Sequence, residues 1–134
     1  MNNAKLFNDR WMKQYQDAWN DEQTMGEMLR KAGFNSTIGC GFKGEDNPRG
    51  VLVVKEGKAV HAGEYGGENL DWDLRAEKAH WRQWQEEGVG MAALGIATIS
   101  GKLTFNVGDF SSMIVQPELA RPFVKSFSLM KKVT

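Results

Sequence analysis

The chain has 134 residues, with 17 basic and 17 acidic side chains and therefore no formal net charge. This length suggests one domain, which we expect to span residues 1–134 and to bury a core without disulfides or metal. Because phosphate binding normally requires a basic excess or a basic face, the charge balance argues against a nucleic-acid partner.

Cys40 is the only cysteine, so no intramolecular disulfide can form and an oxidising compartment is not implied. The first residues contain no apolar segment of signal-peptide length. No uninterrupted apolar run approaches the ~18 residues that a membrane-spanning helix needs. We therefore expect a cytoplasmic protein.

Two helices are predicted at the start of the chain. Aromatic residues recur at every fourth position, at Phe7, Trp11, Tyr15 and Trp19. This spacing predicts a helix over 4–19, since four residues are close to one helical turn. Thr24 and Glu27 fit a capping box for a short helix over 25–32. Gly33 is a plausible left-handed stop.

The next part of the chain predicts a meander of strands. Apolar alternation and β-branched residues mark strands at 37–42, 51–54 and 59–65, and Glu56-Gly57 predicts a tight hairpin between the last two. A fourth strand is expected over 70–76. Its alternation places Leu70, Trp72, Leu74 and Ala76 inward and Asp71, Asp73 and Arg75 outward. Solvation of these outward charges is favoured over an acid–base pair of Asp71 and Asp73.

The last part predicts two helices, a strand and two further helices: 77–87, 91–98, 103–107, a segment after Asp109, and a helix from Pro117. Pro122 predicts a bend or a restart in the last helix, because proline removes a backbone hydrogen bond. Taken together, the elements indicate an α+β fold with a mostly antiparallel sheet.

No catalytic or metal centre is predicted. His61, His80 and Cys40 lack the spacing of a zinc site. Cys40 lies in the middle of a strand on its apolar side, where a small buried thiol is the usual outcome. We therefore expect no metal, no cofactor and no enzymatic activity.

Two other groups of residues leave alternatives open. The five tryptophans, Trp11, Trp19, Trp72, Trp81 and Trp84, favour core packing or a homodimer face over ligand contact. The last predicted helix is basic on its polar side, which carries Arg121, Lys125, Lys131 and Lys132. They are either a solvated face or a surface for transient contact with an anionic membrane.

The order of several short motifs resembles the sterol carrier protein type-two (SCP2-like) lipid-binding domain. The segments that carry it are the hairpin 50–65, Leu70-Asp71-Trp72-Asp73-Leu74, the helix 77–87 with Gly88, the segment 88–107, Gly101-Lys102-Leu103 and Gly108-Asp109. The resemblance covers residues 34–132, preceded by N-terminal helices in residues 1–33.

This resemblance implies a five-stranded sheet with helices covering one face. It also implies a hydrophobic tunnel between that face and the C-terminal helices, which binds fatty acids, acyl-CoA or sterol-like lipids without catalysis. The candidate ligand-binding residues are Met91, Leu94, Leu103, Phe105, Val107, Phe110, Met113, Ile114, Leu119, Phe123, Phe127 and Met130.

Two alternatives to lipid binding and transfer remain open at this point. The same apolar faces could pack a filled core in an interaction or dimerisation module. They could also belong to an accessory domain that presents an apolar substrate to a partner enzyme.

Overall fold

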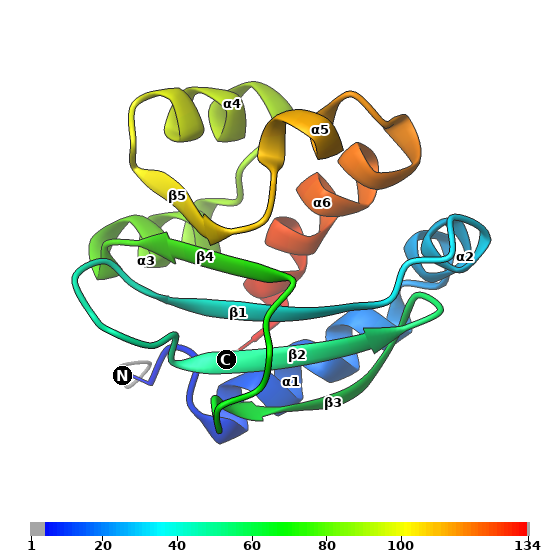
Figure 1. The fold of residues 1–134 in the computed structure, drawn as a ribbon, viewed down its shortest axis with the longest axis horizontal. Coiled ribbons are helices and arrows are strands. Elements are labelled where there is room, and N and C mark those ends of the chain that lie inside the picture. Colours follow the sequence, from blue (N-terminus) through cyan, green and yellow to red (C-terminus); the bar gives the residue numbers. More distant parts are fainter. Residues whose placement is uncertain (1–4, 134) are drawn as a thin grey trace.

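The computed structural model describes residues 5–133 and contains a five-stranded sheet in the order β3-β2-β1-β4-β5 (Figure 1). Its strands are β1 (Ser36–Phe42), β2 (Gly50–Lys55), β3 (Lys58–Glu64), β4 (Trp72–Ala76) and β5 (Leu103–Val107). Strands β1 and β4 run parallel, and the other neighbours are antiparallel. The predicted α+β fold with a mostly antiparallel sheet is confirmed.

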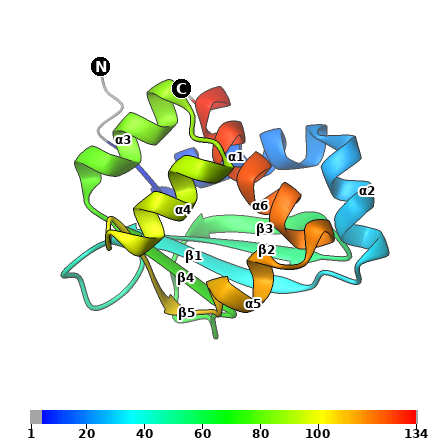
Figure 2. The ribbon, with the colours of Figure 1, turned by 90° about the horizontal axis from the view of Figure 1, so that it is seen from above.

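The helices lie on one side of this sheet (Figure 2). They are α1 (Asp9–Asp21), α2 (Gln23–Lys31), α3 (Lys78–Glu87), α4 (Met91–Ile99), α5 (Phe110–Ile114), α6 (Pro117–Leu129) and the 3-10 helix η1 (Met130–Lys132). Helices α4 and α5 lie beyond the β5 edge, and the connection from β3 to β4 crosses the other side of the sheet (Figure 1).

Helix α1 begins at Asp9 and residues 5–8 are not helical, so the helix predicted over 4–19 begins later than expected; residue 4 itself lies outside the described residues. Asn8 caps the helix, because its side chain accepts the backbone N–H of Trp11 at 2.8 Å. Phe7 precedes the cap with a left-handed φ of 67°. Its fully buried ring contacts those of Trp11 and Trp81, each at a centroid distance of 4.9 Å. Phe7 therefore belongs to the core without being helical.

The predicted capping box at Thr24 is also wrong. Helix α2 begins at Gln23, and its N-cap residue Glu22 makes no side-chain capping bond. The backbone N–H of Glu22 donates to the carbonyl of Trp19, so α1 passes into α2 through a single residue. Gly33 follows α2 with a φ of 68°, which confirms the left-handed stop.

A two-residue turn joins β2 to β3, as predicted. Glu56 and Gly57 both have positive φ, 49° and 80°, which suits the twist of a tight hairpin. A Cβ on Gly57 would lie 2.5 Å from the carbonyl oxygen of Gly26. The missing side chain therefore also lets α2 approach the hairpin closely.

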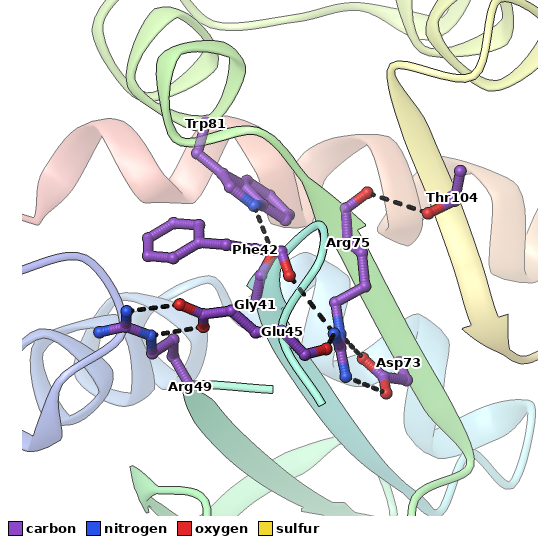
Figure 3. Close-up of polar contacts among 8 residues, drawn as sticks. All are labelled: Gly41, Phe42, Glu45, Arg49, Asp73, Arg75, Trp81 and Thr104. Carbon is purple, nitrogen blue, oxygen red and sulfur yellow. Dashed lines mark hydrogen bonds and ion pairs between the residues drawn. The ribbon is translucent and has the colours of Figure 1, made fainter. Parts of the chain in front are cut away.

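Strand β4 carries a buried ion pair of Asp73 and Arg75, so the prediction that Asp73 is solvated is wrong (Figure 3). Arg75 Nε and Nη2 donate to the carboxylate of Asp73 at 2.6 and 3.0 Å. Arg75 Nη1 donates to the carbonyl of Glu45 at 2.7 Å and to that of Phe42 at 3.3 Å. The β1–β2 loop thus covers this face, which strand alternation alone does not indicate.

The start of β4 also differs from the prediction. The strand begins at Trp72, and Leu70 does not share its inward face. A Cβ on Gly39 would lie 3.2 Å from Leu70, on the side of β1 opposite Ile38 and Cys40. Leu70 therefore covers the face of the sheet that is turned away from the helices.

Strand β5 begins as predicted, but its alternation breaks. Leu103 pairs with Ala76 and Phe105 with Leu74, whereas Val107 pairs with Asp73 after a register shift. The extra residue is Asn106, as in a β-bulge. The shift places Val107 opposite Asp73, and its side chain is 40% exposed.

Helix α6 runs without interruption from Pro117 to Leu129, so the predicted restart at Pro122 is wrong. Pro117 lies at the first helical position, as predicted, where its missing N–H costs little. Pro122 cannot donate to the carbonyl of Glu118. Glu118 is in the exposed first turn, where solvent can replace that bond.

An aromatic cluster fixes α3 and α6 to the sheet. The indole of Trp81 donates to the carbonyl of Gly41 in β1 at 2.8 Å. Its ring stacks on Phe127 of α6 with centroids 5.9 Å apart, and Trp84 contacts both rings. Since large aromatic side chains bury much apolar surface, this cluster sets how closely α6 approaches β1.

Candidate apolar binding site

An apolar cavity of about 60 Å³ lies between the sheet and the helices. Such a volume holds roughly five water molecules, so it is a narrow space. Helices α1, α2, α5 and α6 and strands β1 and β4 contribute to its wall. The lining residues are Tyr15, Trp19, Leu29, Phe34, Ile38, Cys40, Trp72, Leu74, Met113, Leu119, Pro122, Phe123, Ser126, Phe127 and Met130.

The sheet contributes the floor of the cavity through alternate residues. Ile38 and Cys40 of β1 point to the helical side, as the alternation predicts, and Leu74 of β4 lies beside them because Cys40 pairs with Leu74. Trp72 extends this floor, opposite Ile38. Parallel pairing of β1 and β4 therefore places four apolar side chains on one surface.

Three polar side chains on the wall are bonded to backbone carbonyls. The hydroxyl of Tyr15 donates to Ser126 O at 3.0 Å, and the hydroxyl of Ser126 donates to Phe123 O at 2.6 Å. The indole of Trp19 donates to Gly57 O at 3.0 Å. With these three groups occupied, the wall offers mainly apolar contact.

Two titratable groups on the wall are held neutral. Burial raises the pKa of the Cys40 thiol to about 12, and the nearby charge of Asp73 adds to this shift. Burial also raises the pKa of the Tyr15 phenol above its usual range. A thiol that remains protonated at neutral pH is a poor nucleophile.

A row of aromatic rings supports the α6 side of the cavity. Phe123 contacts Phe127 with ring centroids 5.2 Å apart, and both line the space. Behind Phe123 lie Phe105 at 6.0 Å and Phe110 at 5.8 Å. Phe105 also contacts Trp72 at 6.1 Å, so the row joins the floor to the helices.

The structure brings five of the predicted ligand-binding residues to the cavity: Met113, Leu119, Phe123, Phe127 and Met130. Phe105 and Phe110 lie one layer behind them, against Phe123. That these residues contact a ligand remains a prediction.

The other predicted residues lie away from the cavity wall. Leu94 and Leu103 are fully buried, and Ile114 is half-buried. Met91 and Val107 are 45% and 40% exposed. A role for these five residues in ligand contact would therefore require the helices to move.

Sequence reasoning missed the contribution of the N-terminal region. Tyr15, Trp19 and Leu29 line the cavity, although the resemblance begins at residue 34. The four-residue aromatic spacing of α1 was the available signal, since it marks a face that must be covered. It does not reveal whether that face meets other side chains or a space.

The tryptophans divide between core and cavity. The hydrophobic core contains Trp11, Trp81 and Trp84, in keeping with the interpretation that favoured core packing over ligand contact. Trp19 and Trp72 line the cavity from opposite sides, on α1 and β4. These two indoles are therefore placed to report on anything that enters.

A second, larger groove of about 590 Å³ lies near the start of α1, lined by Lys5, Leu6, Phe7, Asn8, Phe42, Pro48, Arg49, Glu64, Tyr65 and Lys78. Charges of both signs surround it, and Arg49 is already paired with Glu45. Across residues 5–133, no three His, Cys, Asp or Glu side chains gather in a way that could hold a metal ion. The apolar cavity is therefore the better candidate for a site.

Comparisons with known proteins agree on the fold. A crystal structure of sterol carrier protein 2 superposes with a TM-score of 0.76 at 17% identity, covering 97% of this chain and 100% of the other. A conserved hypothetical protein of Thermus thermophilus, described as a candidate sterol carrier protein, gives a TM-score of 0.70 at 15% identity, covering 100% and 94%. The UbiJ-SCP2 ubiquinone synthesis protein gives 0.56 at 13% identity, covering 90% and 87%.

No protein-family model matches the sequence, and no curated protein matches it significantly. At these identities the likeness establishes a shared fold. The predicted SCP2-like architecture is thus confirmed.

Proposed function

We propose that this protein binds and transfers a hydrophobic ligand, a fatty acid, acyl-CoA or sterol-like lipid, without catalysis. The observation that carries the proposal is the apolar cavity between the sheet and α6, where the polar groups of Tyr15, Trp19 and Ser126 are already bonded to backbone carbonyls. A protonated, 2% exposed Cys40 supports a binding role over nucleophilic catalysis. The fold shared with sterol carrier protein 2 adds support.

Apolar burial would supply the binding free energy. Each ligand methylene removed from water contributes about 0.8 kcal/mol. Affinity should therefore rise with chain length until the cavity is filled. A polar headgroup would stay outside the apolar wall, where a basic side chain such as Lys125, exposed and 3.8 Å from Glu22, could pair with it.

Fluorescence titration with saturated fatty acids of increasing length tests the proposal. Because Trp19 and Trp72 line the cavity, we expect tryptophan emission to change on binding and the Kd to fall by up to roughly fourfold per methylene. A Trp72→Phe variant should lose part of the signal, whereas Trp84→Phe, outside the cavity, should keep it. An emission that does not respond to any chain length would reject the proposal.

The small volume favours one alternative, an interaction module with a filled core. In that case a homodimer would carry the function, through a surface other than the tryptophans, since these lie in the core or on the cavity wall. Native mass spectrometry of protein purified from cells separates the two, since a co-purified lipid supports the carrier and a lipid-free dimer supports the module. An accessory domain that serves a partner enzyme would also co-purify with lipid. Capture of the partner enzyme with this protein as bait would distinguish that role. All three fit a cytoplasmic protein.

A further inference from the structure

Helix α4 presents an apolar surface that no other part of residues 5–133 covers. Ile99 is 89% exposed, Ile96 65% and Met91 45%, and Ala92 and Ala93 are exposed as well. The helix packs on the protein through Leu94 and Ala97. It lies at the outer edge of the molecule beyond β5 (Figure 1). Contiguous exposed apolar surface of this kind marks an interaction site.

The polar groups of α4 are suited to a medium without water. Its only side chains with hydroxyls, Thr98 and the C-cap residue Ser100, bond to backbone carbonyls of the same helix, Leu94 O at 2.9 Å and Ala97 O at 3.3 Å. The segment 88–101 contains no charged residue. Inserting its outer face into a lipid layer would therefore leave no side-chain donor unsatisfied.

Lysines from other segments border both ends of this apolar helix. Lys131 of η1 lies against Gly88, which precedes the helix. A Cβ on Gly88 would be 3.3 Å from the Cδ atom of the Lys131 side chain. Lys43 of the β1–β2 loop bonds to the carbonyl of Gly101, after the helix, and Lys102 follows in the sequence. Glu86 and Glu87 end α3 nearby. Lysines that border an apolar face attract anionic headgroups while the apolar side chains enter the acyl region.

A protein partner fits this surface less well. The cores of protein interfaces are enriched in aromatic residues, methionine and arginine and depleted in lysine and alanine. The segment 88–102 has one methionine, Met91, but no aromatic residue and no arginine, and it exposes Ala92 and Ala93 as well as Lys102.

We propose that α4 is a membrane-docking helix, which places Met91, Ile96 and Ile99 in the outer layer of an anionic bilayer while Lys43, Lys102 and Lys131 contact its headgroups. No helix among the described residues is long and apolar enough to span a bilayer, so the contact lies in the plane of the surface. Docking does not depend on the proposed ligand binding, because neither the isoleucines nor these lysines line the cavity.

Co-sedimentation with vesicles tests this docking. We expect the wild type to bind vesicles of phosphatidylcholine mixed with phosphatidylglycerol more strongly than phosphatidylcholine alone. The double variant Ile96→Ser/Ile99→Ser should weaken binding by roughly a hundredfold, since two exposed apolar side chains would no longer enter the lipid. Val60→Ser is the matched control on β3, where Val60 is 48% exposed, and should bind as the wild type does.

The lysines are tested separately. Lys102→Gln and Lys131→Gln should each weaken binding to anionic vesicles by roughly fivefold, with little change on phosphatidylcholine. Lys58→Gln, an exposed lysine on β3, is the control and should have no effect.

Three results would overturn the proposal: no vesicle binding by the wild type, equal binding by the isoleucine variant, or a dimer in sedimentation equilibrium that this variant dissociates without any vesicle binding. The last would assign the surface to a second copy of the chain. Fatty-acid titration of the Ile96→Ser/Ile99→Ser variant separates a failure of the docking proposal from a failure of the proposed carrier function. Because these isoleucines do not line the cavity, the variant should bind fatty acids with the affinity of the wild type.

Discussion

The buried pair of Asp73 and Arg75 locks the β1–β2 loop onto β4. The side chains of Asp73 and Arg75 are only 7% and 3% exposed, and Arg75 also bonds to the carbonyl of Glu45 in the loop and to that of Phe42 at the end of β1. Changing Arg75→Met would leave the Asp73 charge buried without a partner. We expect this variant to lose about 3–5 kcal/mol of unfolding free energy, measured by urea denaturation.

An exposed pair in the same loop provides the control. Arg49 and Glu45 form an ion pair with side chains 52% and 37% exposed. Because exposed pairs contribute little, Arg49→Gln should cost less than about 1 kcal/mol. Equal losses in the two variants would show that burial of the Asp73–Arg75 pair has no special effect.

The thiol of Cys40 predicts a pH dependence of stability. Its pKa in the folded protein is about 12, above the usual 9.0 of a thiol. The unfolded chain therefore loses this proton first, and the contribution of Cys40 to stability is complete below pH 9.0 and declines between pH 9.0 and 12. Burial raises the pKa of Tyr15 as well, above its usual 10.0, so the interval between pH 9.0 and 10.0 reports mainly on Cys40.

Urea denaturation across this interval measures the effect. Wild-type unfolding free energy should fall as the pH rises, and Cys40→Ala should show a flatter dependence from a lower starting value. Parallel curves for the two proteins would contradict the assignment.

At the scale of elements, regular alternation predicted the strands, and specific contacts ended or interrupted them. The positions of β1, β2, β3 and β5 follow from apolar periodicity. The bulge at Asn106 does not, because it depends on how β5 pairs with β4. The solvent-facing interpretation of Asp73 failed for a related reason, since a loop remote in sequence covers that face.

The glycine between β5 and α5 controls the position of a cavity residue. Gly108 has a φ of 108°, and a Cβ there would clash with the ring of Trp72. We expect Gly108→Ala to be destabilised by backbone strain and by displacement of the indole, and to change both tryptophan emission and ligand affinity. Thermal unfolding and fluorescence measure the two effects.

Gly101, at the other end of β5, is the matched control. Its φ is also positive, at 81°, but no atom lies within 4 Å of where a Cβ would be. Gly101→Ala should therefore show strain alone, about 1 kcal/mol, with unchanged emission. If both variants shift the emission alike, the contact with Trp72 is not the cause.

At the scale of the whole molecule, the cavity joins the two halves of the sequence. The resemblance implied the C-terminal part of the wall, at Met113, Leu119 and Phe123. It could not predict Tyr15 and Trp19, because α1 reaches the cavity only when it packs across the sheet beside α6. Long-range packing of this kind leaves no local pattern in the sequence.

A long acyl chain, as proposed, would not fit the cavity without additional space. About 60 Å³ is less than the ~150 Å³ in which an engineered protein cavity binds benzene, so a long acyl chain requires additional space. Phe123 lies half-buried at the centre of the aromatic row, in contact with Phe105, Phe110 and Phe127. Its ring is the most direct obstacle to such a chain.

Phe123→Ala should therefore have opposite effects on stability and on binding. We expect it to lose up to about 3 kcal/mol of unfolding free energy without ligand, since truncation leaves unfilled space. We also expect its preferred fatty acid to be longer than that of the wild type by several methylenes, with a larger rise in Tm on binding. Phe110→Ala removes a ring that contacts Phe123 but does not line the cavity. This control should lose stability without changing which fatty-acid length binds best. If the wild type, Phe123→Ala and Phe110→Ala all prefer the same fatty-acid length, the binding site lies elsewhere.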